Sequence, residues 1–130
     1  MAETACRILL VDDEPSLLKM MSMYLTRLGY EVTTAVTTEK ALSEFQTDPS
    51  SFAGAVLDAT MPGISMEELA LTMLGSQPSL FVIGASGYPL DMAAIEETAP
   101  GRVMFLHKPF SPEMLARAIR RMLGAQETSL

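Results

Sequence analysis

Apolar residues along the chain follow two alternating patterns. Short runs rich in Val, Ile, Leu and Ala predict five β-strands, at residues 7–11, 31–35, 53–57, 80–85 and 103–106. Between and after these runs, apolar residues recur every three to four positions, which predicts helices at residues 14–28, 38–47, 66–74, 90–98 and 112–123. Strands with few charges that alternate with amphipathic helices favour a parallel sheet covered on both faces. The pattern therefore predicts a doubly wound α/β fold.

Signals for helix boundaries support this division. Ser65, with Glu68 three residues later, has the form of a capping box at the start of the third helix. Ser111 followed by Pro112 marks the start of the fifth. Glycine often ends a helix because it adopts the left-handed conformation without strain. Three such ends are predicted, after the first, third and fifth helices: Gly29, Gly75 and Gly124.

Length and charge narrow the function classes. The 130 residues suit one domain, with a core at about 6–123 and a short tail at 124–130. A net charge of −7 argues against direct binding of nucleic acid, which depends on Lys and Arg. The sequence shows no apolar run long enough to insert into a membrane and no signal peptide, so we expect a cytoplasmic protein. The single cysteine, Cys6, is given no role, and His107 is expected at the surface.

Polar residues follow four of the predicted strands. Asp12 and Asp13 come after the first strand, Asp58 after the third, Ser86 after the fourth and Lys108 after the fifth. Ligands of open α/β sheets bind at the carboxyl ends of the strands. Three acids, one hydroxyl and one ammonium are therefore expected at the same edge.

This set of groups suits phosphoryl transfer. Clustered carboxylates repel one another unless a cation joins them, and all-oxygen ligands favour Mg²⁺ (or Mn²⁺). Phosphoryl transfer needs positioning and neutralisation of charge on the phosphoryl oxygens, which a metal ion, Lys108 and Ser86 would supply. Asp58 would be the nucleophile, and an acyl phosphate the product.

Four stretches resemble the response-regulator receiver family in order and spacing, across about residues 6–123. They are residues 9–14 (LLVDDE), 56–63 (VLDATMPG), 86–88 (SGY) and 108–110 (KPF). The resemblance implies a five-stranded, flavodoxin-like sheet of order 2-1-3-4-5. Two places depart from the family's pattern: Met66 replaces a usual Gly, and residues 100–102 (PGR) replace an acidic turn.

The resemblance also implies individual roles. Asp58 would accept phosphate from a histidine kinase's phospho-His. Asp13, Asp58 and the backbone carbonyl of Thr60 would bind the metal ion, with Asp12 acting through water. The Lys108–Pro109 peptide bond would be cis and would aim the lysine.

Four residues are assigned to switching and to the lifetime of the phosphoryl group. By the same resemblance, the Ser86 hydroxyl would move to the phosphate and the ring of Phe105 would follow inward, although burial alone would also explain an aromatic residue there. Tyr88 would shield the phosphoryl group from water, and Thr60 would influence its lifetime together with Tyr88.

Three alternative functions are weighed. A haloacid-dehalogenase-type phosphatase needs a second Asp two residues after the nucleophile, where this chain has Thr60. A flavodoxin-like cofactor binder needs a glycine- and hydroxyl-rich phosphate loop after the first strand, where this chain is acidic. A receiver-like docking domain without phosphorylation stays open. We expect no enzymatic activity beyond transfer of the phosphoryl group to the chain itself and its slow release.

The resemblance implies a histidine kinase or a phosphotransfer protein as donor and an unknown downstream effector. A homodimer through the face of the fourth helix, fifth strand and fifth helix is a further possibility. The sequence does not distinguish a stand-alone regulator from a piece of a longer protein.

Overall fold

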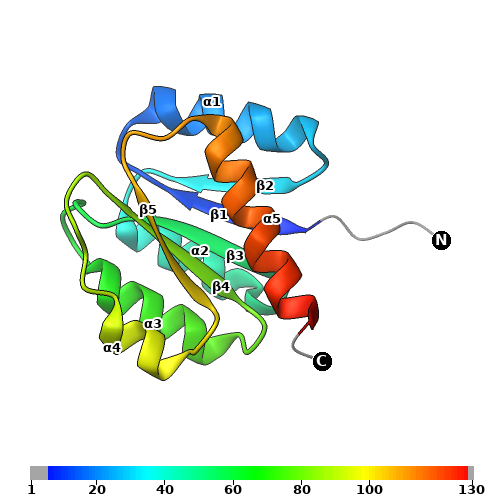
Figure 1. Ribbon diagram of the computed structural model, residues 1–130. Helices are drawn as coiled ribbons and strands as arrows, with labels where there is room; N and C mark the ends of the chain where they lie inside the picture. The colour runs from blue at the N-terminus through cyan, green and yellow to red at the C-terminus, as the bar shows by residue number, and fades with distance from the viewer. Residues whose placement is uncertain (1–5, 129–130) are drawn as a thin grey trace.

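The computed structural model describes residues 6–128 and has one five-stranded parallel sheet of order β2-β1-β3-β4-β5 (Figure 1). The strands are β1 (Arg7–Val11), β2 (Glu31–Ala35), β3 (Phe52–Asp58), β4 (Phe81–Ser86) and β5 (Val103–His107). The helices are α1 (Pro15–Arg27), α2 (Thr38–Thr47), α3 (Met66–Ser76), α4 (Ala93–Thr98) and α5 (Pro112–Thr128). A single 3-10 turn, η1 (Pro49–Ser51), precedes β3. The predicted fold class and strand order are confirmed.

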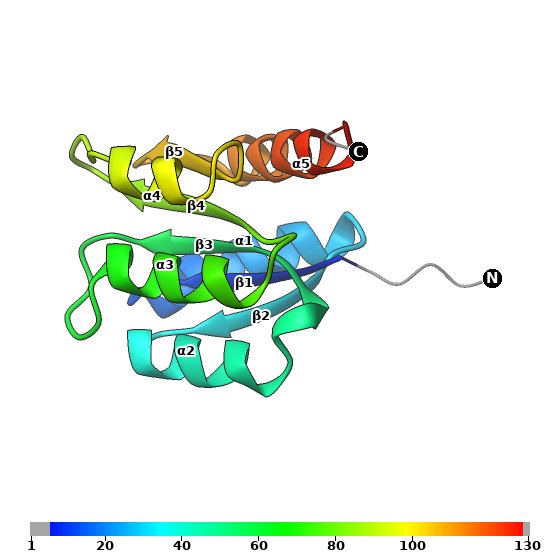
Figure 2. The ribbon, with the colours of Figure 1, turned by 90° about the horizontal axis from the view of Figure 1, so that it is seen from below.

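Helices cover both faces of the sheet. In Figure 1, α1 lies above the sheet, α5 runs down its right-hand side, and α3 and α4 lie below it. The turned view of Figure 2 shows α2, α3 and α4 across one face, while α1 and α5 pack together on the other. Each face has its own core, because successive strand residues point to opposite sides. Leu9 and Val11 pack with α2, α3 and α4, whereas Ile8 and Leu10 pack with α1 and α5. This double burial explains why the strands carry so few charges.

The capping signals act as predicted at two helix starts. Ser65 Oγ accepts a hydrogen bond from Glu68 N at 3.1 Å, and Ser111 Oγ accepts one from Met114 N at the same distance. The fourth helix is shorter than the predicted 90–98. It begins at Ala93, where the Asp91 carboxylate accepts the Ala93 N–H.

Two of the three predicted glycine stops are wrong. Gly29 follows α1 with φ +100°, but α3 continues past Gly75 to Ser76 and α5 continues past Gly124 to Thr128. The third helix ends instead at Ser76, because Gln77 precedes Pro78 and a residue before a proline disfavours the helical conformation. Glycine inside a helix costs only about 1 kcal/mol relative to alanine, and Ala125, Gln126 and Glu127 after Gly124 favour helix.

Arg102, in one of the two departures from the family pattern, fastens the start of β5 to the end of α3. Its Nε donates to the Leu80 carbonyl at 2.8 Å, and one Nη donates to the carbonyls of Leu74 at 3.0 Å and Gln77 at 2.7 Å. Partial burial lowers the pKa of Arg102, yet an arginine stays charged at any ordinary pH. This side chain therefore supplies a donor to three carbonyls at the amino edge of the sheet.

Replacing Arg102 with methionine should lower the free energy of unfolding by about 2 kcal/mol, since hydrogen bonds from a charged donor are lost and their acceptors stay partly buried. Urea denaturation followed by circular dichroism measures the change. The control is Arg121→Met on the exposed side of α5, for which we expect a change of at most about 0.5 kcal/mol. Equal unfolding midpoints for the two variants would contradict this role of Arg102.

Candidate functional site

The carboxyl ends of four strands meet at one edge of the sheet. Strand pairing sets Val11 beside Leu57, Asp58 beside Ala85 and Ser86 beside His107. The residues that end or follow these strands therefore lie at the same level. They include Asp12, Asp13, Asp58, Ser86 and Lys108, as the sequence pattern predicts.

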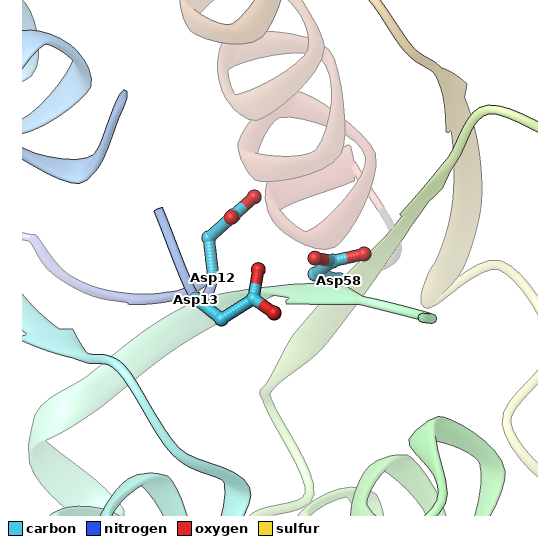
Figure 3. A group of neighbouring side chains, drawn as sticks. All are labelled: Asp12, Asp13 and Asp58. Carbon is cyan, nitrogen blue, oxygen red and sulfur yellow. The ribbon is translucent and has the colours of Figure 1, made fainter. Parts of the chain in front are cut away.

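Three carboxylates gather at this edge (Figure 3). One oxygen of each of Asp12, Asp13 and Asp58 lies within 4.8 Å of the others. Figure 3 shows the carboxylate of Asp13 turned toward Asp58. Asp12 and Asp58 are buried, with 7% and 5% of their surface exposed, whereas Asp13 is exposed. Two of the three negative charges are thus largely removed from water.

Lys108 brings a positive charge to this group. Its Nζ lies 2.8 Å from Asp12 Oδ2 and 3.4 Å from Asp58 Oδ2. Burial lowers the pKa of the Lys108 ammonium, but the hydrogen bond and charge of Asp12, together with Asp58, outweigh that effect and raise the pKa above its usual value. Lys108 is therefore charged at neutral pH. The Lys108–Pro109 peptide bond is cis, and Lys108 N donates to the Ser86 carbonyl at 2.8 Å.

The two oxygens of Asp58 have different neighbours. Oδ2 faces Lys108, while Oδ1 accepts hydrogen bonds from Thr60 N at 3.1 Å and from Thr60 Oγ1 at 2.9 Å. Asp12 is oriented in a similar way, because its Oδ1 accepts a hydrogen bond from Glu14 N at 3.0 Å. Short turns after β1 and β3 therefore hold both buried carboxylates in defined orientations.

Ser86 and Tyr88 are linked at the end of β4. The Ser86 hydroxyl is buried and accepts the Tyr88 N–H at 3.0 Å. The Tyr88 side chain itself lies in solvent, since 71% of the residue's surface is exposed. The Ser86 hydroxyl is therefore part of the edge that carries the acids, and the Tyr88 ring lies outside it.

Phe105 lies apart from the acids. It is half-buried on β5, and its ring contacts His107 edge-on, with 6.2 Å between ring centroids and 89° between ring planes. His107 is exposed at the end of the same strand, as predicted.

Sequence reasoning missed Thr38, whose buried side chain reaches the loop after β3. Two adjacent threonines, Thr37 and Thr38, precede and start α2, and each looks like an ordinary cap in the sequence. Only Thr37 accepts the capping hydrogen bond, from Lys40 N at 3.0 Å. The pairing of Thr38 with a distant loop has no local signal.

The donor set fits a divalent metal ion. Three carboxylates face one ammonium, which leaves a net charge of about −2 when all four groups are ionised. Oxygen ligands of this kind suit hard cations such as Mg²⁺, which needs only one or two carboxylates and keeps several waters. The acidic group could therefore hold such an ion.

Comparison with known proteins identifies the family. A family model described as "Response regulator receiver domain" matches residues 8–120. The chain belongs to this family. It is 34% identical over 126 residues to the "Probable transcriptional regulator ycf27" of Cyanophora paradoxa, covering 93% of this chain and 49% of that protein.

Solved receiver domains have the same fold. A CheY-like receiver domain protein from Methanospirillum hungatei superposes with a TM-score of 0.83 at 27% identity, over 97% of this chain and 99% of that one. A receiver domain protein from Clostridium thermocellum gives 0.82 at 26% identity, over 96% and 99%. Both superpositions cover nearly the whole chain. The chain itself spans about half or less of the length of the first curated relatives.

Membership of the family gives the general function. This chain is the receiver domain of a response regulator in two-component signalling. Receiver domains interact with histidine kinases and effector domains, and they are signalling domains rather than classical enzymes. Within the part of the chain that the structure describes, no helix is long and apolar enough to cross a bilayer.

Proposed function

We propose that this receiver accepts a phosphoryl group on Asp58 from the phospho-His of a histidine kinase or phosphotransfer protein. The observation that carries the proposal is the setting of Asp58, which is buried at the end of β3 with one oxygen facing Lys108 and the other held by Thr60. A carboxylate held in this way has little conformational freedom to lose before it attacks.

The residues that would hold Mg²⁺ (or Mn²⁺) are Asp13, Asp58 and the backbone carbonyl of Thr60, with Asp12 acting through water. When bound, the ion would neutralise charge on the phosphoryl oxygens during transfer. The mutual closeness of the three carboxylates supports this set. The exposure of Asp13 agrees with an ion that reaches the site from solvent.

The chain's own groups would carry out the transfer. A carboxylate oxygen of Asp58 forms a bond to phosphorus while the phosphorus–nitrogen bond to the donor histidine breaks, and the imidazole nitrogen keeps the electron pair. Lys108, already 3.4 Å from Asp58 Oδ2, would hold one phosphoryl oxygen, and the Ser86 hydroxyl would hold another. The product is an acyl phosphate on Asp58.

A rotation of the Ser86 side chain toward the phosphoryl group would start the conformational switch. Its hydroxyl accepts the Tyr88 N–H in this structure, so a turn toward the phosphate would release that bond and change the loop before α4. Phe105 would then move inward from its half-buried position on β5. The altered face of α4, β5 and α5 would bind the downstream effector or a second copy of the domain.

The proposal extends to the partners, the localisation and the extent of the domain. The donor and the effector are proteins, and a net charge of −7 supports the absence of direct contact with nucleic acid. We place the domain in the cytoplasm, without membrane insertion, as one unit over residues 1–130. Its own chemistry is limited to accepting the phosphoryl group and slowly releasing it.

Phosphorylation is tested by intact-mass measurement after incubation with Mg²⁺ and acetyl phosphate. We expect the wild type to gain ~80 Da, one phosphoryl group on the carboxylate nucleophile, and Asp58→Asn to gain nothing. A gain in both proteins would place the phosphoryl group on another residue. No gain in a folded wild type, even with a phosphorylated donor protein, would favour the docking-only alternative.

Tyr88 and Thr60 are proposed to set the phosphoryl lifetime. Tyr88→Ala removes a ring that would fold over the phosphate and exclude water, so the acyl phosphate should decay roughly threefold faster. The decay is followed by intact mass after rapid removal of the donor. Tyr88→Phe keeps the ring, so its acyl phosphate should decay at the wild-type rate. Thr60→Ala measures the contribution of Thr60 to the same decay rate. An unchanged decay rate in Tyr88→Ala would rule out shielding by this side chain.

A further inference from the structure

Thr38 is a buried polar residue that the proposed chemistry does not use. Within the part of the chain that the structure describes, four polar or charged residues are buried: Asp12, Thr38, Asp58 and Ser86. Three of them belong to the phosphoacceptor site. Thr38 is 2% exposed, at the first turn of α2, and burial of a hydroxyl is unfavourable unless hydrogen bonds compensate for the lost water.

The hydrogen bonds of Thr38 lead to the loop between β3 and α3, residues 59–65. Its Oγ1 accepts the Ile64 N–H at 3.0 Å and lies 3.4 Å from the Pro62 carbonyl oxygen and 3.2 Å from Glu39 Oε1. A hydroxyl has one proton, so it donates to one of those two acceptors at a time. The bond to Ile64 joins residues 26 positions apart and ties the loop to α2.

Gly63 lets the loop pass close to this hydroxyl. Its φ is +97°, a conformation that glycine adopts without strain, and a Cβ built there would lie 2.5 Å from Thr38 Oγ1. Ile64 on the far side of Gly63 packs against the core. The loop is therefore fitted to the start of α2 by shape as well as by hydrogen bonds.

The fastened loop is the one that carries Thr60. Thr60 lies two residues before Pro62, and its amide and hydroxyl both donate to Asp58 Oδ1. We propose that Thr38 is a positioning residue for the phosphoacceptor site, because its hydroxyl holds the loop that presents the amide and hydroxyl of Thr60 to Asp58. The proposal rests on the proposed function of Thr60 and Asp58 in metal binding and phosphoryl transfer.

A positioning role for Thr38 implies coupling between metal binding and the hydrogen bond from Ile64 to Thr38. If the Thr60 carbonyl is a ligand of the metal ion, then ion binding and the hydrogen bond between Thr38 and Ile64 stabilise each other, since coupling between two sites is reciprocal. Mg²⁺ should therefore slow hydrogen exchange of the Ile64 amide in the unmodified chain. Loss of the Thr38 hydroxyl should weaken Mg²⁺ binding.

The variant that tests this is Thr38→Val, which keeps the shape of the side chain and removes the hydroxyl. We expect the Ile64 amide to exchange roughly tenfold faster and the Mg²⁺ dissociation constant to rise about tenfold, as when the binding-competent fraction falls to a tenth. Exchange is measured by NMR and binding by calorimetry. Two variants are controls: Thr38→Ser, which restores the hydroxyl, and Thr47→Val, the same change at the exposed far end of α2. Thr38→Ser should stay within about twofold of the wild type because it keeps the hydroxyl, and Thr47→Val should do so because substitutions at exposed positions have small effects.

A purely structural role would give a different result. Thr38→Val would then unfold at lower urea concentration, while the folded protein bound Mg²⁺ as the wild type does, and this outcome overturns the proposal. If Thr38→Val does not fold, the wild-type protein decides: an Ile64 amide that Mg²⁺ fails to protect overturns the proposal, and a protected one supports it. A wild type that binds no Mg²⁺ would overturn the proposed metal function itself, and the positioning role with it.

Discussion

The mutual repulsion of Asp12, Asp13 and Asp58 is the constraint on which the arrangement of the site depends. One oxygen of each lies within 4.8 Å of the others, and two unit charges 4 Å apart near a protein surface interact by about 4 kcal/mol. The chain opposes this repulsion with Lys108, which lies 96 residues from its hydrogen-bond partner Asp12 in the sequence. The ammonium therefore links the first and last strands of the chain electrostatically, and it leaves net negative charge at the edge.

The fold supplies the rigidity that such a group needs. Because helices cover both faces, β1, β3 and β4 are buried and their register fixes where each acid or hydroxyl stands. Short turns then orient the side chains through Thr60 and Glu14 amides. Hydrophobic burial thus holds like charges together, and the chemistry of the edge follows from the topology of the sheet.

The sequence predicts the fold well because its signals are local. Few charges in the strands, helical periods between them and the caps at Ser65 and Ser111 are sufficient for the architecture, and the acids stand directly after strands. Helix ends at glycine are harder to predict, since Gly75 and Gly124 cost little inside a helix while Pro78 decides one end.

Long-range hydrogen bonds are the part that the sequence does not predict. Arg102 donates to three backbone carbonyls at the end of α3 and in the connection to β4, and Thr38 accepts from the Ile64 amide, so each partner is a backbone group of a distant segment. Any residue offers such a group, so no pattern of residue types marks the pair. These contacts depend on how the packed elements bring the loops together.

The most direct test of the site is a crystal structure of the chain with Mn²⁺ and beryllofluoride, a phosphoryl analogue. We expect one anomalous Mn²⁺ peak between Asp13, Asp58 and the Thr60 carbonyl oxygen, beryllofluoride on an Asp58 oxygen, and Lys108 Nζ moved from Asp12 to a fluoride. An ordered protein with no peak among these carboxylates, or with beryllofluoride on another residue, would contradict it.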